Sequence, residues 1–119
     1  MMNLSCHCGN ISITVPAGPE NLLSCNCSTC HRYGALWGYY KPSEIVVEIK
    51  TEKTGTYRWG DEHLEFMHCS TCGCMTHYVT TEKADKPKVG INFRMADRKE
   101  IQDLKIRKFD GADTWKFLD

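Results

Sequence analysis

The chain has 119 residues, of which 41% are hydrophobic, enough for one domain with a modest core, since domains usually run to about 100–150 residues. Its net charge is 0, which argues against binding of nucleic acid through the phosphates, because proteins of that class carry a basic excess. The sequence contains no run of about 18 apolar residues, so it predicts no membrane-spanning helix. The first six residues also lack the features of a secretion signal. We therefore expect a cytoplasmic protein with no membrane partner.

Alternating hydrophobic and polar residues predict short β-strands along most of the chain. The first strand runs through Ile11, Ile13 and Val15 and ends at residues 16–19, which contain two prolines and a glycine. Further strands are predicted over residues 45–49, 54–59, 64–68, 75–80, 89–95 and 104–109. One helical turn is predicted over residues 96–103. Because no segment has the long 3.6-residue period of a helical bundle, we expect one mainly β domain over residues 1–119, built as a sandwich or a stack of sheets.

Eight cysteines in so short a chain are the most informative feature of the composition. They fall into three segments: Cys6-His7-Cys8, Cys25-Asn26-Cys27-Ser28-Thr29-Cys30 and Cys69-Ser70-Thr71-Cys72-Gly73-Cys74. Cysteines two or three residues apart form only strained disulfides, whereas this spacing lets two sulfurs bind one metal ion about 2.3 Å from each. The spacing therefore predicts metal sites. Zinc is favoured over an iron–sulfur cluster, because the longer cysteine runs of ferredoxins are missing.

The positions of two glycines suggest how the cysteines divide between metal ions. Gly9 and Gly73 each follow a cysteine directly, and a glycine there can adopt the positive φ that closes a zinc-binding turn. The cysteines of these two turns could form a closed structural site with four ligands: Cys6, Cys8, Cys69 and Cys72. The remaining three, Cys25, Cys27 and Cys30, would leave one position open, as in a catalytic zinc site. Cys74 could be the fourth ligand of this second zinc or take no part, and the sequence leaves both alternatives open.

In order and spacing, these motifs resemble those of the glutathione-dependent formaldehyde-activating (Gfa)/CENP-V family. The matching motifs are Cys6-x-Cys8-Gly9, Cys25-x-Cys27-x-x-Cys30, Gly34-Ala35 and Cys69-x-x-Cys72-Gly73. The resemblance covers nearly the whole chain, from Cys6 to about Asp113. It implies stacked antiparallel sheets of the β-tent type, with loops clipped together by zinc.

The same resemblance implies two Zn²⁺ ions per chain and a carbon–sulfur lyase activity. The implied ligands are Cys6, Cys8, Cys69 and Cys72 for a structural zinc, and Cys25, Cys27 and Cys30 for a catalytic zinc. The implied reaction is the addition of glutathione to formaldehyde, which gives S-hydroxymethylglutathione. An open zinc held by three thiolates suits this chemistry, because it can capture a substrate thiol and lower its pKa.

Two residues after the central cysteines depart from the simplest family pattern. His31 and then Arg32 follow Cys30, where many members have arginine directly after the third cysteine. His31 could transfer a proton or be an ordinary surface histidine. Arg32 could pair with a carboxylate of the thiol substrate or lie on the surface. The aromatic segment 33–40 could wall a pocket near the cysteines or belong to the core.

A second hypothesis is a scaffold without enzymatic activity, held together by two zinc ions and binding a protein partner. It would apply if Cys74 closed the second site and left no position for a substrate. Exposed sheet edges would also suit a homodimer.

Overall fold

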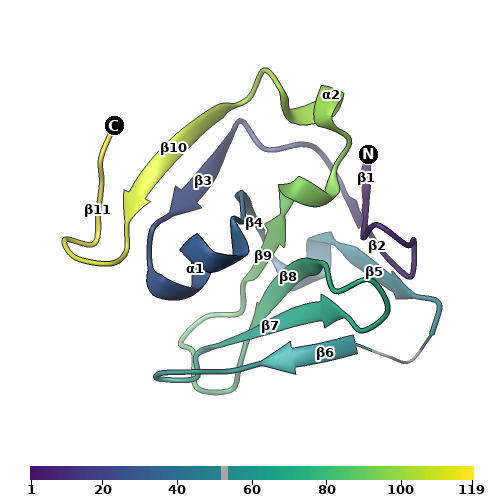
Figure 1. The fold of residues 1–119 in the computed structure, drawn as a ribbon, viewed down its shortest axis with the longest axis horizontal. Coiled ribbons are helices and arrows are strands. Elements are labelled where there is room, and N and C mark those ends of the chain that lie inside the picture. The colour runs from purple at the N-terminus through teal and green to yellow at the C-terminus, as the bar shows by residue number, and fades with distance from the viewer. Residues whose placement is uncertain (52–53) are drawn as a thin grey trace.

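Two β-sheets make up most of the structure, a computed structural model that describes residues 1–51 and 54–119 (Figure 1). The smaller sheet has the strand order β1 (Met2–Ser5), β2 (Ile11–Val15) and β5 (Val46–Ile49). The larger sheet has the order β11 (Lys116–Phe117), β10 (Lys105–Asp110), β3 (Asn21–Cys25), β4 (Trp37–Tyr40), β9 (Val89–Asn92), β8 (Met75–Thr80), β7 (Leu64–Cys69) and β6 (Thr54–Tyr57). The helical segments are α1 (Ser28–Tyr33), η1 (Pro42–Glu44), η2 (Phe93–Met95) and α2 (Arg98–Ile101).

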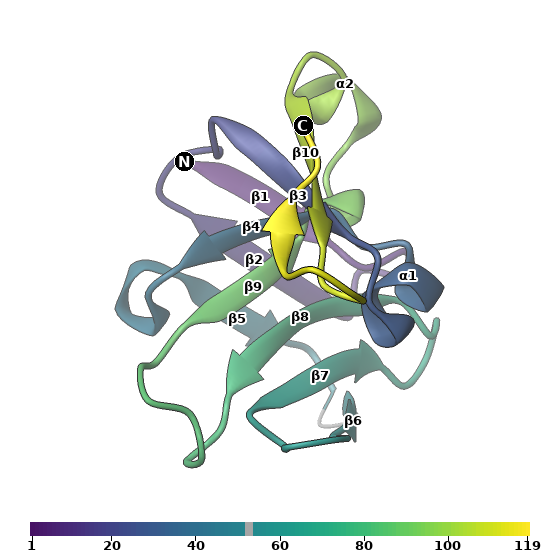
Figure 2. The same cartoon turned by 90° about the vertical axis from the view of Figure 1, so that its left-hand side faces the viewer.

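The core lies between the two sheets. Viewed from the side, the small sheet forms a layer behind β4, β9 and β8 (Figure 2). Strand β2 follows its sequence pattern, because Ile11, Ile13 and Val15 are buried and the residues between them are partly exposed. These side chains share one cluster with Leu22 and Ile91 of the large sheet. Apolar burial between the layers therefore holds the two sheets together.

A second hydrophobic cluster consists largely of aromatic side chains. Its buried members are Ala35, Trp37, Phe66, Met75 and Tyr78. Trp37 and Tyr78 meet edge to face, with their ring centroids 4.8 Å apart. Gly90 makes room for Tyr78, because a Cβ at this position would overlap the Tyr78 ring. The aromatic segment that follows α1 thus contributes Trp37 to the core, while Trp37 and Tyr39 also line a cavity, so both sequence alternatives hold in part.

Most predicted strands are confirmed, with shifts at their ends. The strand predicted over residues 89–95 is wrong at its end, because β9 stops at Asn92. The Asn92 side chain accepts a hydrogen bond from the Arg94 N–H at 3.1 Å and so starts the 3₁₀ turn η2. The expectation of antiparallel sheets holds for the other strand pairs of the described residues but is wrong for β10 and β3, which pair in parallel. The β-tent arrangement stays a prediction. Among the described residues, no helix has the length and hydropathy needed to cross a membrane.

The buried ring of His77 makes stability depend on pH. His77 lies on β8, is 4% exposed, and its Nδ1 is 2.8 Å from Thr76 Oγ1. Burial lowers the pKa of His77 from 6.5 to about 4, so between these two values the unfolded chain binds a proton that the folded chain does not. We expect the free energy of unfolding to be unaffected by His77 above about pH 6.5 and to fall by about 3 kcal/mol as the pH drops to 4.

Urea denaturation of the wild type and of His77→Gln at pH 7 and pH 4.5 measures this effect. Glutamine does not titrate, so the variant should lose less stability on acidification, while acid effects common to both proteins cancel. His63→Gln is the matched control, because the His63 side chain is 50% exposed. Equal losses in the wild type and His77→Gln would contradict the assignment.

Candidate functional site

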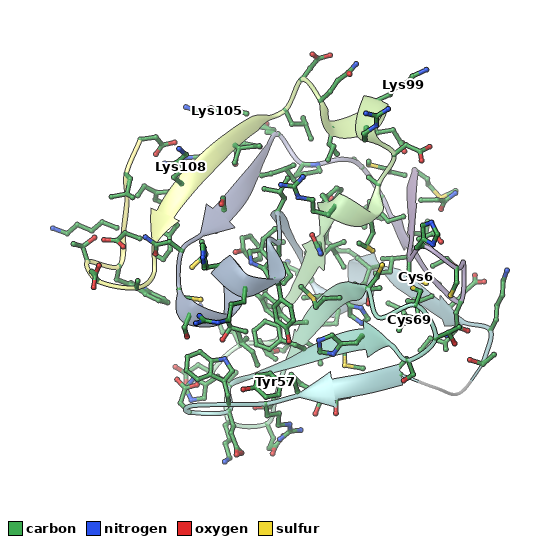
Figure 3. The ribbon with its side chains drawn as sticks, viewed as in Figure 1. Cys6, Tyr57, Cys69, Lys99, Lys105 and Lys108 are labelled. Carbon is green, nitrogen blue, oxygen red and sulfur yellow. The ribbon has the colours of Figure 1, made fainter. Side chains whose placement is uncertain are left out.

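Four cysteine sulfurs, two from the start of the chain and two from its middle, meet at one end of the sheets. Figure 3 labels two of these residues, Cys6 and Cys69. This four-thiol cluster consists of Cys6, Cys8, Cys69 and Cys72, with all Sγ atoms within 4.8 Å of one another. The Sγ atoms of Cys6 and Cys8 are 3.8 Å apart, and those of Cys8 and Cys69 are 3.6 Å apart. Tetrahedral zinc with bonds of about 2.3 Å requires sulfurs about 3.8 Å apart, so the cluster has the geometry of a zinc site.

Two glycine turns shape the four-thiol cluster as the sequence predicted. Gly9 and Gly73 have φ values of 83° and 82°. The N–H of Gly9 donates to the Cys6 carbonyl at 3.1 Å, and that of Gly73 donates to the Cys69 carbonyl at 2.8 Å. Backbone N–H groups in these turns face the sulfurs: Cys72 N–H lies 3.5 Å from Cys69 Sγ. Backbone hydrogen bonds also lower the pKa of Cys72 to about 5, which favours the thiolate that binds a metal ion.

Cys74 does not join the three central cysteines, which corrects one alternative from the sequence. It follows the β7–β8 turn, where its carbonyl accepts a hydrogen bond from the Cys69 N–H at 3.0 Å. Its thiol interacts with Cys72, and it packs beside the four-thiol cluster. The short link to Cys72 keeps Cys74 at this end of the molecule, far along the chain from Cys25, Cys27 and Cys30. Cys74 is a member of neither group of clustered sulfurs.

The remaining sulfurs form a three-thiol cluster, Cys25, Cys27 and Cys30, with all Sγ atoms within 4.8 Å of one another. Cys25 ends β3, Cys27 is the N-cap of α1, and Cys30 lies one turn into that helix. The Cys27 sulfur accepts a hydrogen bond from the Cys30 N–H at 3.4 Å, which replaces the usual oxygen cap. Within residues 1–51 and 54–119, no fourth Cys, His, Asp or Glu completes this cluster.

The surroundings of the three-thiol cluster fit a bound cation. Burial raises the pKa values of Cys25 and Cys30, so neither thiol ionises readily by itself. A zinc ion would stabilise the thiolates and is the ion that short-spaced sulfur ligands select. The buried indole nitrogen of Trp37, which lines the same space, has no hydrogen-bond partner among the described residues. Its N–H is therefore free to donate to a thiolate or to a ligand.

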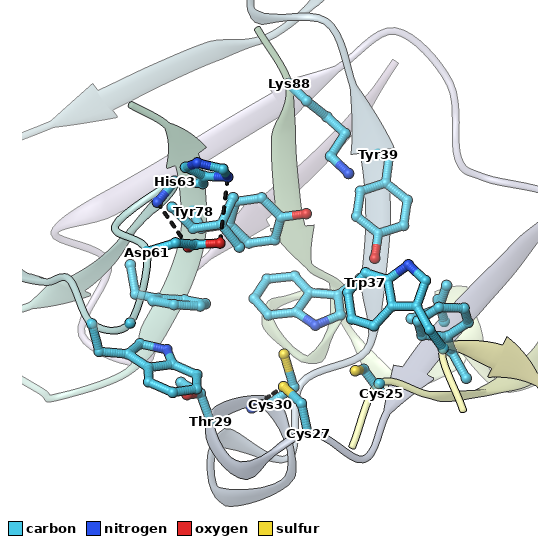
Figure 4. Close-up of a pocket in the computed structure, with 18 residues that line it drawn as sticks. Cys25, Cys27, Thr29, Cys30, Trp37, Tyr39, Asp61, His63, Tyr78 and Lys88 are labelled. Carbon is cyan, nitrogen blue, oxygen red and sulfur yellow. Dashed lines mark hydrogen bonds and ion pairs between the residues drawn. The ribbon is translucent and has the colours of Figure 1, made fainter. Parts of the chain in front are cut away.

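The three thiols open into a cavity of about 630 Å³ (Figure 4). We call this cavity the thiol pocket. Seven aromatic side chains line it: Trp37, Tyr39, Trp59, Phe66, Tyr78, Phe109 and Trp115. The volume lies in the range of small-molecule sites, about 300–1,000 Å³. The arrangement therefore combines three cysteines that could hold a metal ion with space for a ligand.

The thiol pocket also contains charged side chains that the sequence did not mark. Asp61 Oδ2 lies 3.5 Å from His63 Nδ1, and the backbone N–H of His63 donates to Asp61 Oδ1 at 3.2 Å (Figure 4). Lys88 Nζ lies 4.6 Å from the centroid of the Tyr39 ring. These residues come from separate turns and strands, so only the fold brings them near the cysteines. Gly60 favours a turn between the two neighbouring strands, but a turn residue alone does not predict a place in a binding pocket.

His31 and Arg32 lie on the exposed last turn of α1 and do not line the thiol pocket. Arg32 instead borders a smaller neighbouring cavity of about 410 Å³, together with Ser28, Thr29, Tyr33, Tyr57 and Trp59. Its Nη1 donates to the Ser28 carbonyl at 2.9 Å. Thr29 and Trp59 line both cavities, so the two adjoin. His31 lines neither of them.

Comparison with known proteins agrees with this arrangement of cysteines. Residues 1–109 match the family model described as glutathione-dependent formaldehyde-activating enzyme (GFA). The chain belongs to this family. Its structure is also similar to the crystal structure of a Rhodobacter sphaeroides protein, with a TM-score of 0.70 and 24% sequence identity over 88% of this chain and 99% of that chain. That similarity supports the fold alone, and no curated protein matches the chain.

Gly111 offers a way to disturb the three-thiol cluster of this GFA-family chain without changing a cysteine. A Cβ at this position would lie 2.6 Å from Cys25 Sγ, closer than van der Waals contact allows. Gly111→Ala should therefore displace the Cys25 sulfur and lower the zinc content from about two to about one per chain. Gly55→Ala is the control, because its Cβ would have 3.8 Å to the nearest atoms. Metal analysis of the purified variants decides; an unchanged zinc content in Gly111→Ala would contradict the assignment.

The two clusters should also differ in their effect on folding. The four-thiol cluster joins turns about sixty residues apart, whereas the three-thiol cluster joins ligands within residues 25–30. Metal binding across the longer separation removes more freedom from the unfolded chain. Cys72→Ser should lower the melting temperature by about 10 °C or more, and Cys27→Ser by less than about 5 °C. Thermal unfolding followed by circular dichroism tests this, and equal shifts would contradict the division into structural and catalytic sites.

Proposed function

We propose that this chain is a zinc-dependent carbon–sulfur lyase that joins a thiol, glutathione or a related one, to an aldehyde. The observation that carries the proposal is the three-thiol cluster, which lacks a fourth protein ligand among the described residues and faces the thiol pocket. Such a site leaves one ligand position for a substrate. Membership of the GFA family supports the same reaction class.

The reaction needs a thiolate and a proton donor. Zinc held by Cys25, Cys27 and Cys30 would supply the ligand position at which a substrate thiol loses its proton near neutral pH. A new bond then forms between sulfur and the carbonyl carbon, the C=O π bond breaks, and the oxygen takes up a proton to become a hydroxyl. The proton lost by the thiol balances the proton gained by the oxygen, so no oxidant or reductant is required.

The Asp61–His63 pair is suited to moving that proton. Asp61 Oδ2 lies 3.5 Å from Nδ1 of His63, so the carboxylate would favour one orientation of the imidazole and leave Nε2 to exchange a proton with the ligand. This assignment replaces the sequence hypothesis for His31, whose ring lines neither cavity. The hydrophobic walls around the three thiols limit access of water and strengthen the electrostatic contacts within the pocket.

Arg32 fits the role of anchoring the thiol substrate. Arg32 borders the smaller cavity, and among residues 1–51 and 54–119 its one hydrogen bond runs from Nη1 to the Ser28 carbonyl. The remaining N–H groups suit a carboxylate such as those of glutathione. Because the two cavities share Thr29 and Trp59, the body of the thiol would occupy the smaller one while its sulfur reaches the three-thiol cluster.

The alternative of a two-zinc scaffold has lost its supporting feature. That hypothesis required Cys74 to close the second metal site, and Cys74 lies beside the four-thiol cluster instead. The enzyme hypothesis therefore explains more of the observed geometry.

Exchange spectroscopy tests the proposed activity directly. Formaldehyde and thiols combine without a catalyst, so the measured quantity is the rate at which ¹³C-formaldehyde exchanges with S-hydroxymethylglutathione in NMR. The zinc-loaded protein should increase this rate at least about tenfold over buffer, which corresponds to about 1.4 kcal/mol of transition-state stabilisation. Cys27→Ser should remove the acceleration while the fold persists.

Cobalt substitution gives an independent control. In the cobalt-loaded protein, glutathione should change the visible absorption of the three-thiol site, because a new sulfur ligand enters the coordination sphere. A spectrum that does not respond to glutathione, combined with an exchange rate equal to that of Cys27→Ser, would refute the proposed function.

A further inference from the structure

The lining of the thiol pocket indicates what kind of aldehyde the chain handles. Formaldehyde has one carbon and one oxygen, whereas the pocket measures about 630 Å³ and is lined by seven aromatic side chains. We infer that the carbon part of the adduct is an aromatic group, held between Trp59 and Trp115 next to the three thiols. This inference rests on the proposed function and names the substrate class of the same site.

Trp115 is placed in a way that folding alone does not explain. Its side chain is 71% exposed, and its backbone has a φ of 58°, which is unfavourable for a residue with a Cβ. A large apolar side chain in the solvent and in a strained conformation adds little to stability. Strain of this kind persists where the surrounding structure enforces it, and it is concentrated at binding sites.

A network around Asp110 enforces this conformation and ties it to the cysteines. Asp110 is 7% exposed and accepts hydrogen bonds from Asn26 Nδ2 at 2.9 Å and from Thr114 Oγ1 at 2.8 Å. The Trp115 N–H donates to the Asp110 carbonyl at 2.7 Å. Because Asn26 lies between two of the three clustered cysteines, the loop that presents Trp115 is fixed relative to the thiols.

Trp115 and the three-thiol cluster border the same small space. A Cβ added to Gly111 would lie 2.6 Å from Cys25 Sγ and 3.5 Å from Trp115 Cζ3. The Trp115 and Phe109 rings meet edge to face with their centroids 5.0 Å apart, and most of the exposed Trp115 side chain is left for another partner. A group bonded to a sulfur at the cluster would therefore lie within reach of this indole.

Trp59 supplies a second indole from a different part of the chain. It is 43% exposed and lies in the β6–β7 turn, where Gly60 and Glu62 have φ values of 61° and 59°. The same pocket is lined by the buried set Trp37, Phe66 and Tyr78, whose rings pack against one another. Rigid aromatic walls of this kind bind flat apolar groups by stacking and leave a one-carbon group without contacts.

Isothermal titration calorimetry of the zinc-loaded protein tests the inference with two simple thiols. Benzyl mercaptan should bind at least about tenfold more tightly than 2-mercaptoethanol, because the ring adds contacts that the polar thiol lacks. In Trp59→Ala and Trp115→Ala this preference should fall to about threefold or less, while Trp115→Phe should retain most of it. Leu118→Ala is the control, since Leu118 is an exposed apolar residue of the same terminal segment but does not line the pocket.

Benzyl alcohol separates failure of this inference from failure of the proposed function. If neither thiol binds but benzyl alcohol binds more weakly to Trp115→Ala than to the wild type, the aromatic site stands and the thiol chemistry fails. Equal affinities for the two thiols in the wild type, or an equal preference in all variants, would overturn the inference and leave the proposed function in place. Trp115→Gly should keep or raise the melting temperature, because glycine tolerates the positive φ; a marked decrease would assign Trp115 to folding and count against ligand binding.

Discussion

The meeting of cysteine sulfurs from distant turns is the constraint on which the candidate sites depend. The four-thiol cluster joins the turn after β1 to the turn after β7, so it connects the small sheet to the large one at the edge of their shared apolar core. Four thiolates within 4.8 Å repel one another unless a cation lies between them. Binding of the proposed zinc ion at this cluster would therefore be linked to the docking of the two sheets.

The same chemistry serves a different purpose at the three-thiol cluster, because its ligands are local. Cys25, Cys27 and Cys30 lie on one strand end and the first turn of α1, and their geometry is set by the short loop and the Cys27 N-cap. The pairing of the sheets therefore does not depend on a metal ion at this cluster. A site that is not needed to hold the fold can leave a coordination position for a ligand, and its open side faces the aromatic pocket.

Sequence patterns predicted the parts of this protein that depend on local spacing. Alternation located β2, β5 and most strands of the large sheet, and cysteine spacing located both clusters. Strand β4 was missed because aromatic residues on both faces hide its period, and α1 was missed because six residues are too few for a helical period. Asp61 and His63 could not be found at all, since only the folded sheet brings the β6–β7 turn to the cysteines.

Metal binding and ligand selection are assigned to different kinds of segment in this fold. The sulfur ligands lie at strand ends, the N-cap of α1 and tight glycine turns, where a shift of about one ångström would disrupt coordination. Trp59 and Trp115, the residues inferred to face the carbon part of a ligand, are partly or largely exposed and lie in turns between strands. Substitution of these two side chains would change the proposed ligand contacts without removing a cysteine. The Asp110 network is the exception, because it couples the Trp115 turn to the loop of Asn26, so substitutions there should affect selectivity and metal geometry together.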